Sequence, residues 1–198
     1  MKGTLFVLSG PSGTGKGTVC AELLKLPCDL TLSVSATTRE QRAGEIAGQT
    51  YHYVSTDTFE TMIKEDGMLE YAVYSGNYYG TPKAVVEALI NDGKDVLLEI
   101  EPQGALQVKK LIPEAVLIFL VPPSMEELRR RLLTRGREDE EEIAHRIATA
   151  KWELEQADKY TTLITNDNLA QCVEDVLGFI NLKRAEKNII NRLINENV

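Results

Sequence analysis

The stretch Gly10–Thr18, which reads GPSGTGKGT, decides the fold of this 198-residue chain. It follows a short apolar run, Thr4–Leu8, and precedes a helical pattern that begins near Lys16. A glycine-rich turn that opens a helix presents several backbone N–H groups and the positive end of the helix dipole to one anionic group. The lysine adds a charge that reaches the β- and γ-phosphates of a nucleotide. The sequence therefore predicts a strand, a phosphate-binding loop and a helix, in that order.

This loop departs at one position from the common string in which Ser or Thr follows the lysine. Gly17 stands where the hydroxyl is expected, and Thr18 comes next. Thr18 is therefore the candidate for a direct metal contact, and we expect no other side chain to ligate a metal directly. A tight turn with a solvated lysine is the competing interpretation, but such a turn needs only one or two glycines.

The charge balance argues against a general nucleic-acid binder. The chain has 22 Lys and Arg against 30 Asp and Glu, for a formal net charge of −8, whereas nucleic-acid binders need a basic face. The arginines nevertheless gather in two clusters, which suits a small, multiply charged anion. These clusters comprise Arg39 and Arg42, and Arg129, Arg130, Arg131, Arg135 and Arg137.

No apolar run approaches the length needed to span a bilayer, and the first residues lack a signal-peptide pattern. The three cysteines show no metal-ligand spacing and are expected to be reduced thiols that pack in the interior. We therefore expect a cytoplasmic protein with no membrane or nucleic-acid partner, and the oligomeric state stays open.

Strand-like and helix-like segments alternate, which predicts an α/β fold with a mostly parallel five-stranded sheet flanked by helices. The expected strands are Thr4–Leu8, Leu30–Ser35, Asp95–Ile100, Ala115–Val121 and Thr162–Thr165. Helices are expected to start at Thr81, Ser124, Asp139 and Asn168.

Two stretches interrupt this alternation. Residues 37–80 contain strand-like pieces around Tyr51–Val54 and Leu69–Tyr74, with a helix expected over Thr58–Glu65. This pattern predicts a small, partly antiparallel lobe inserted after the second strand. Residues 134–139 are short, charged and broken by a glycine, which is typical of a mobile flap between two helices.

The acceptor side of the site is expected just after the second strand, where open α/β sheets hold ligands. Arg39 and Arg42 lie three positions apart there and can form a forked clamp for a phosphate monoester. Tyr51 and Tyr79 can add hydroxyl donors. The alternative is that the arginines are solvated on a loop and the tyrosines pack.

Across nearly its whole length the chain resembles the guanylate kinases, which are P-loop nucleoside monophosphate kinases. The strings that carry the resemblance are Gly10–Lys16, Ser33–Arg39, Arg42–Glu45, Gly76–Thr81, Gln103–Gly104, Pro122–Ser124 and Arg135–Gly136. The resemblance implies a single domain with a P-loop NTPase core (1–34 and 82–198), an inserted α+β GMP-binding lobe (35–81) and a short lid (134–146). It implies transfer of the γ-phosphoryl group of ATP to GMP, with Mg²⁺ as cofactor and dGMP as a second candidate acceptor.

The loop and the resemblance together assign the site residues. The ATP site is expected to comprise Gly10, Pro11, Ser12, Gly13, Thr14, Gly15, Lys16, Gly17, Thr18, Arg131 and Asn166. The resemblance implies that GMP contacts Ser35, Arg39, Arg42, Tyr51, Glu70, Tyr79, Thr81 and Glu101. The expected catalytic residues are Lys16, Arg42, Arg135 and Arg146.

Glu70 suits guanine for a chemical reason. The pairing edge of guanine offers two adjacent donors, which one carboxylate can accept together, whereas adenine would turn a lone pair toward that carboxylate. Sites built on buried polar groups reject such mismatches strongly. No general base is expected, because a phosphate oxygen is already anionic near neutral pH, so positioning and charge stabilisation would carry catalysis.

Gln41 stands where the family often has proline, and Glu99 and Glu101 stand where many members have aspartate. Two other functions stay open at this point. One is a peptide-binding module of the same fold that has lost catalysis, although such modules typically have degraded phosphate loops. The other is a kinase of the same fold for a different phosphate ester, such as AMP or a ribose bisphosphate.

Overall fold

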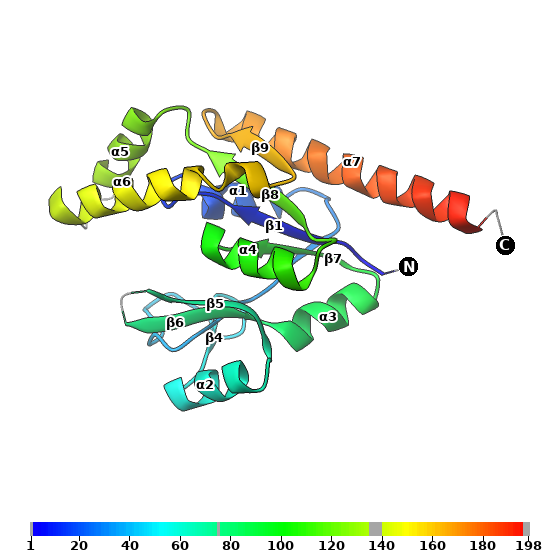
Figure 1. Ribbon diagram of the computed structural model, residues 1–198, viewed down its shortest axis with the longest axis horizontal. Coiled ribbons are helices and arrows are strands. Elements are labelled where there is room, and N and C mark those ends of the chain that lie inside the picture. Colours follow the sequence, from blue (N-terminus) through cyan, green and yellow to red (C-terminus); the bar gives the residue numbers. More distant parts are fainter. Residues whose placement is uncertain (1, 75, 135–139, 196–198) are drawn as a thin grey trace.

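The computed structural model describes residues 2–74, 76–134 and 140–195 (Figure 1). Its core is a five-stranded sheet with the order β2-β7-β1-β8-β9, and every neighbouring pair is parallel. The strands are β1 (Leu5–Ser9), β2 (Leu30–Leu32), β7 (Asp95–Glu99), β8 (Val116–Val121) and β9 (Thr162–Thr165). The predicted α/β fold with a parallel five-stranded sheet is therefore confirmed.

Helices cover both faces of this sheet because its strands bury side chains in both directions. On one face, Phe6 and Leu8 of β1 pack with α1 (Lys16–Leu23) and α7 (Leu169–Asn195). On the other face, Leu5 and Val7 pack with α3 (Lys83–Asn91) and α4 (Pro102–Leu111). Within the described part of the chain, no helix is both long enough and apolar enough to cross a membrane.

Two further helices pack against each other beside the phosphate loop, at the end of the molecule opposite the C-terminus (Figure 1). They are α5 (Met125–Thr134) and α6 (Glu140–Leu154), and Leu128, Leu132 and Ala150 are buried between them. A 3₁₀ turn, η1 (Ala157–Lys159), leads from α6 toward β9.

The predicted inserted lobe forms a second sheet with the order β4-β3-β6-β5. Its elements are β3 (Ala36–Thr37), β4 (His52–Tyr53), α2 (Thr56–Lys64), β5 (Met68–Tyr74) and β6 (Asn77–Pro82). β6 pairs antiparallel with both β3 and β5, and β3 pairs parallel with β4. Figure 1 shows α4 between the core sheet and β5, so this helix joins the two parts of the molecule.

One predicted helix start is wrong. Thr81 belongs to β6, and α3 begins at Lys83 with Pro82 as its N-cap. The Thr81 hydroxyl is not free to cap the helix because it donates to Glu70. The predicted caps at Ser124 and Asn168 are confirmed, since each side chain accepts an N–H from the residue three positions later.

Other boundaries shift by a few residues. β2 ends at Leu32 rather than at Ser35, and α2 begins at Thr56 because the Ser55 hydroxyl accepts the Thr58 N–H. α6 begins at Glu140, and the predicted helix start at Asp139 lies outside the described residues.

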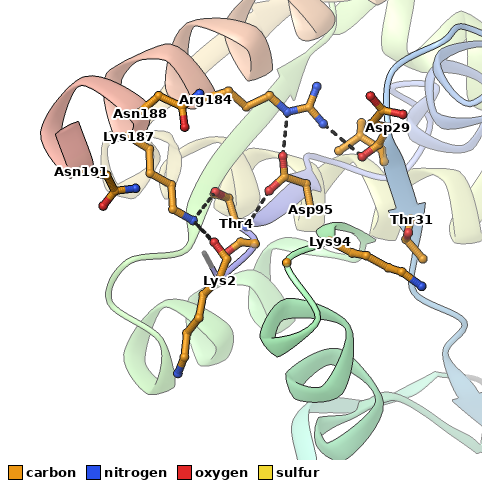
Figure 2. A pocket seen from close by; sticks show the side chains of 13 residues that line it. Lys2, Thr4, Asp29, Thr31, Lys94, Asp95, Arg184, Lys187, Asn188 and Asn191 are labelled. Atoms are coloured by element: carbon orange, nitrogen blue, oxygen red, sulfur yellow. Dashed lines mark hydrogen bonds and ion pairs between the residues drawn. The ribbon is translucent and has the colours of Figure 1, made fainter. Parts of the chain in front are cut away.

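A polar hollow lies at the amino ends of β1, β2 and β7, away from the phosphate loop (Figure 2). Lys187 of α7 donates there to the carbonyls of Lys2 and Gly3 and to the Thr4 hydroxyl. Arg184 donates to Asp95 at 2.6 Å. These cations therefore hold α7 against the sheet instead of facing a ligand.

Asp95 is the centre of this network, because its carboxylate accepts from Arg184 and also from the backbone N–H of Thr4 at 2.6 Å. Replacing Asp95 with Ala leaves both donors without their acceptor, so we expect the free energy of unfolding in urea to fall by about 2 kcal/mol. Glu22→Ala, which breaks an exposed ion pair with Lys25, is the control and should cost no more than about 0.5 kcal/mol. Equal losses in the two variants would contradict this account of α7.

Candidate functional site

The phosphate loop connects the carboxyl end of β1 to α1 and is seated closely on its neighbours. A Cβ at Gly10 would lie 2.3 Å from the Leu120 carbonyl oxygen of β8. Gly13 has a φ of 90°, and a Cβ there would lie 2.9 Å from the Leu132 side chain of α5. Only glycine tolerates such approaches, so the loop lies directly on β8 and α5.

Lys16 is the first residue of α1, and its side chain is buried with the amine at the loop. Its Nζ donates to the Gly10 carbonyl at 2.7 Å and to Oε2 of Glu101 at 2.8 Å. Glu101 is the N-cap residue of α4 and is 55% exposed. Glu101, which was predicted as a GMP-site residue, therefore contacts the loop lysine.

A second carboxylate lies beside the first turn of α1. A Cβ at Gly17 would lie 3.2 Å from Oε1 of Glu99, so the side chain of Glu99 fills the space beside the missing hydroxyl. The pKa of Glu99 is raised because surrounding protein atoms displace water from it and because Glu101 is near, while Lys16 acts in the opposite direction. Thr18 is exposed on the first turn of α1.

Helix α6 contacts the loop through two residues two turns apart. Arg146 donates from Nη2 to the Ser12 hydroxyl, which brings this predicted catalytic arginine to the ATP loop. Glu153 is 7% exposed, and its Oε2 has no hydrogen-bond partner among the described residues. Burial and the charge of Glu101 raise the pKa of Glu153 to about 7. Glu153 was not predicted as a site residue, although its spacing of seven from Arg146 places both on one helix face.

The other two predicted ATP-site residues support the loop from behind. Asn166 donates from Nδ2 to the Thr14 carbonyl at 2.7 Å. Arg131 donates to the Asn166 carbonyl at 3.0 Å and to Glu127 at 2.7 Å. Their side chains are thus engaged with the protein at the back of the loop. Arg135, another predicted catalytic arginine, lies outside the described residues.

In the inserted lobe, Arg39 is held by a carboxylate that the sequence analysis did not assign to the site. Glu45 accepts both Nη groups of Arg39, at 2.8 and 3.1 Å. It also accepts the Tyr53 hydroxyl at 2.7 Å and the backbone N–H of Arg42 at 2.8 Å. The bond from Arg39 is the main reason that the pKa of Glu45 falls to about 2. Glu45 lies in the string Arg42–Glu45, which is part of the family resemblance. The sequence alone does not show that Arg39 is its partner.

The other predicted phosphate-clamp residues surround Arg39. Its Cζ lies 5.6 Å from the centroid of the Tyr51 ring, and Tyr51 meets Tyr79 edge to face at 5.9 Å. The Arg42 side chain is exposed. The structure therefore brings Arg39, Tyr51 and Tyr79 together.

Glu70 lies at the junction of the lobe and α4 and is 6% exposed. Its Oε1 accepts the Thr81 hydroxyl at 2.7 Å. A Cβ at Gly104 of α4 would lie 2.5 Å from its Oε2, so glycine is needed there to make room for the carboxylate. Burial raises the pKa of Glu70 to about 7. Ser35, the third predicted guanine contact, is half-buried at the start of the lobe.

Because its folded-state pKa is raised above the usual 4.5, Glu70 lowers stability as pH rises from about 4.5 through 7. Over that range the native state keeps a proton that the unfolded chain has already lost. Glu70→Gln removes this penalty, so near pH 8 we expect the free energy of unfolding to rise by about 3 kcal/mol, with no difference from the unmodified protein near pH 4. Urea titrations at several pH values measure this, with the exposed Glu65→Gln as control. A pH-independent difference would contradict the burial of an ionisable Glu70.

Comparison with known proteins agrees with this geometry. The guanylate kinase family model matches residues 2–183. The chain is 50% identical to a guanylate kinase of Thermus thermophilus over 93% of its length and 83% of the relative. It is 49% identical to one of Clostridium tetani over 97% of its length and 90% of the relative. The crystal structure of guanylate kinase from Anaplasma phagocytophilum is 31% identical, with a TM-score of 0.74 and coverage of 92% of this chain and 86% of that one. The chain therefore belongs to the guanylate kinase family.

Proposed function

We propose that this protein transfers the γ-phosphoryl group of ATP to GMP, giving ADP and GDP. The observation that carries the acceptor assignment is the buried carboxylate of Glu70, held by Thr81 beside Gly104. Guanine presents two neighbouring donors that a carboxylate in this position can accept together. The relatives named above are guanylate kinases, which supports the same reaction.

ATP is proposed to bind at the phosphate loop, with its phosphates on the N–H groups at the start of α1. Lys16 already points its amine at the loop carbonyls and Glu101, and it would exchange the carbonyls for phosphate oxygens. Arg146 is bonded to Ser12 and is therefore within reach of the same phosphates. Arg131 and Asn166 would act mainly by supporting the loop, through the contacts that they make behind it.

The donor set beside Lys16 fits Mg²⁺. Oxygen groups and water are the ligands that this ion prefers. Glu99 and Glu101 offer carboxylates near the loop that would hold the ion through its bound water, and Thr18 offers a hydroxyl. The absence of a side chain at Gly17 leaves Glu99 next to the loop. When bound, Mg²⁺ would neutralise part of the negative charge on the transferring phosphates.

The GMP phosphate is proposed to bind Arg39, Tyr51 and Tyr79, which lie together in the lobe, and the exposed Arg42. Glu45 fixes the Arg39 guanidinium in one orientation, so that its remaining N–H groups and those of Arg42 can face the phosphate. Guanine is proposed to bind Ser35, Glu70 and Thr81. Glu70 must be ionised to accept from guanine, so binding would displace the proton that burial favours.

Catalysis in this proposal is positioning and charge stabilisation. The attacking GMP oxygen needs no base. Lys16, Arg42, Arg135 and Arg146 would stabilise the charge on the transferring group, and closure of the lobe and lid would exclude water. A cytoplasmic location is proposed with the reaction, since the three cysteines are buried free thiols of the kind that the cytosol keeps reduced.

The first test is ADP release with Mg-ATP and GMP, AMP, CMP, UMP or dTMP offered separately. We expect turnover with GMP alone, and Glu70→Gln should lower kcat/KM for GMP by about a hundredfold or more. Turnover with a different monophosphate would overturn the assignment of Glu70. Binding of ATP and GMP without turnover would favour a binding module instead.

A second test concerns Glu45. Glu45→Ala removes the acceptor that orients Arg39, so KM for GMP should rise by about tenfold while KM for ATP stays unchanged. Because the pKa of Glu45 is about 2, this effect should be constant from mildly acidic to mildly alkaline pH. Glu40→Ala, which removes an exposed carboxylate nearby, is the control. An equal change in KM for ATP would contradict a role confined to the acceptor phosphate.

A further inference from the structure

Strand β5 carries Glu70 at the edge of the lobe sheet, since β5 is the last strand in the order β4-β3-β6-β5. Its pairing with β6 is irregular, with a register shift between Met68 and Glu70. Met68, Leu69 and Glu70 are all buried, at 7%, 1% and 6% exposure. A regular strand would turn alternate side chains to opposite faces, so the irregularity turns Glu70 toward α4.

An irregular edge strand has little to fix its position, because one side of its backbone has no neighbouring strand. Gln107 of α4 supplies the missing partner. Its Oε1 accepts the Tyr71 N–H at 3.2 Å, and its Nε2 donates to the Tyr71 carbonyl at 3.1 Å. One side chain thus makes the same pair of bonds that an adjacent strand would make.

The position of Gln107 links it directly to the carboxylate. Tyr71 follows Glu70 in the chain, and Gln107 lies three residues after Gly104 on the same face of α4. Gly104 makes room for Oε2 of Glu70, and Gln107 holds the next residue of the strand. Figure 1 shows α4 lying alongside β5, so both contacts come from one rigid element.

We propose that Gln107 is a positioning residue for guanine selection, which holds β5 so that the Glu70 carboxylate stays between Thr81 and Gly104. This inference rests on the proposed GMP site. Leu69 packs in the apolar core beneath α4, but apolar contact tolerates sliding. The two directional bonds to Tyr71 fix the position of β5 along its own axis. The Glu70 carboxylate can accept both donors of the guanine edge only from the correct position.

The test uses Gln107→Met, which keeps the length and helix propensity of the side chain and removes both hydrogen bonds. KM for GMP should rise by about tenfold, while kcat and KM for ATP change by no more than about twofold. Binding of GMP and IMP by calorimetry adds a specific readout, because IMP lacks the 2-amino group of guanine. We expect the preference for GMP over IMP to fall by about tenfold. Gln171→Met, at an exposed glutamine of α7, is the matched control.

A double-mutant cycle separates positioning from general stabilisation. In the Glu70→Gln background, Gln107→Met should have less than about a twofold further effect on GMP binding. Gln107→Glu, which keeps an acceptor for the Tyr71 N–H, should give an intermediate loss. The same loss in both backgrounds, or equal losses for ATP, GMP and IMP, would overturn the proposal. Failure of the unmodified protein to turn over GMP would instead contradict the proposed function, so the two failures are distinguishable.

Discussion

The ion pair between Lys16 and Glu101 joins the phosphate loop to the first turn of α4, and the acceptor lobe is attached to the same helix. Glu101 lies at its N-cap, Gly104 makes room for Glu70 one turn later, and Gln107 binds the backbone of Tyr71. The spacing between the phosphate loop and Glu70, the proposed guanine contact, therefore depends on the rigidity of one helix. The two proposed substrates are thereby placed relative to each other without a long flexible connection.

Burial of Glu70 links its proposed role in guanine selection to a cost in stability. The carboxylate loses water and has Thr81 as its compensating donor, which leaves its pKa raised to about 7. Guanine would supply two further hydrogen-bond donors to this carboxylate, whereas a base with an acceptor at that position would not. The proposed phosphate clamp differs, because Glu45 is paired there with Arg39, Tyr53 and the Arg42 backbone and its pKa falls to about 2.

Local pattern was sufficient to predict the loop, the parallel sheet and the inserted lobe, because buried strands and glycine-rich turns are encoded by neighbouring residues. Local pattern did not predict hydrogen bonds between side chains and groups that are distant in the sequence. Thr81 had the local pattern of a helix cap, but its hydroxyl donates to Glu70 across the β5–β6 pair. Gln107 and Tyr71 are 36 residues apart, and no periodicity predicts that contact. The site roles themselves stay predictions, drawn from the resemblance and supported by the gathering of Arg39, Tyr51 and Tyr79.

The most direct measurement of the central claim is proton release when GMP binds, obtained by calorimetry near pH 7 in buffers of different ionisation enthalpy. If a buried Glu70 with a pKa of about 7 must ionise to accept the guanine edge, the unmodified protein should release about half a proton more than Glu70→Gln. This comparison subtracts any proton released by the GMP phosphate itself. Equal proton release by the two proteins would contradict the account.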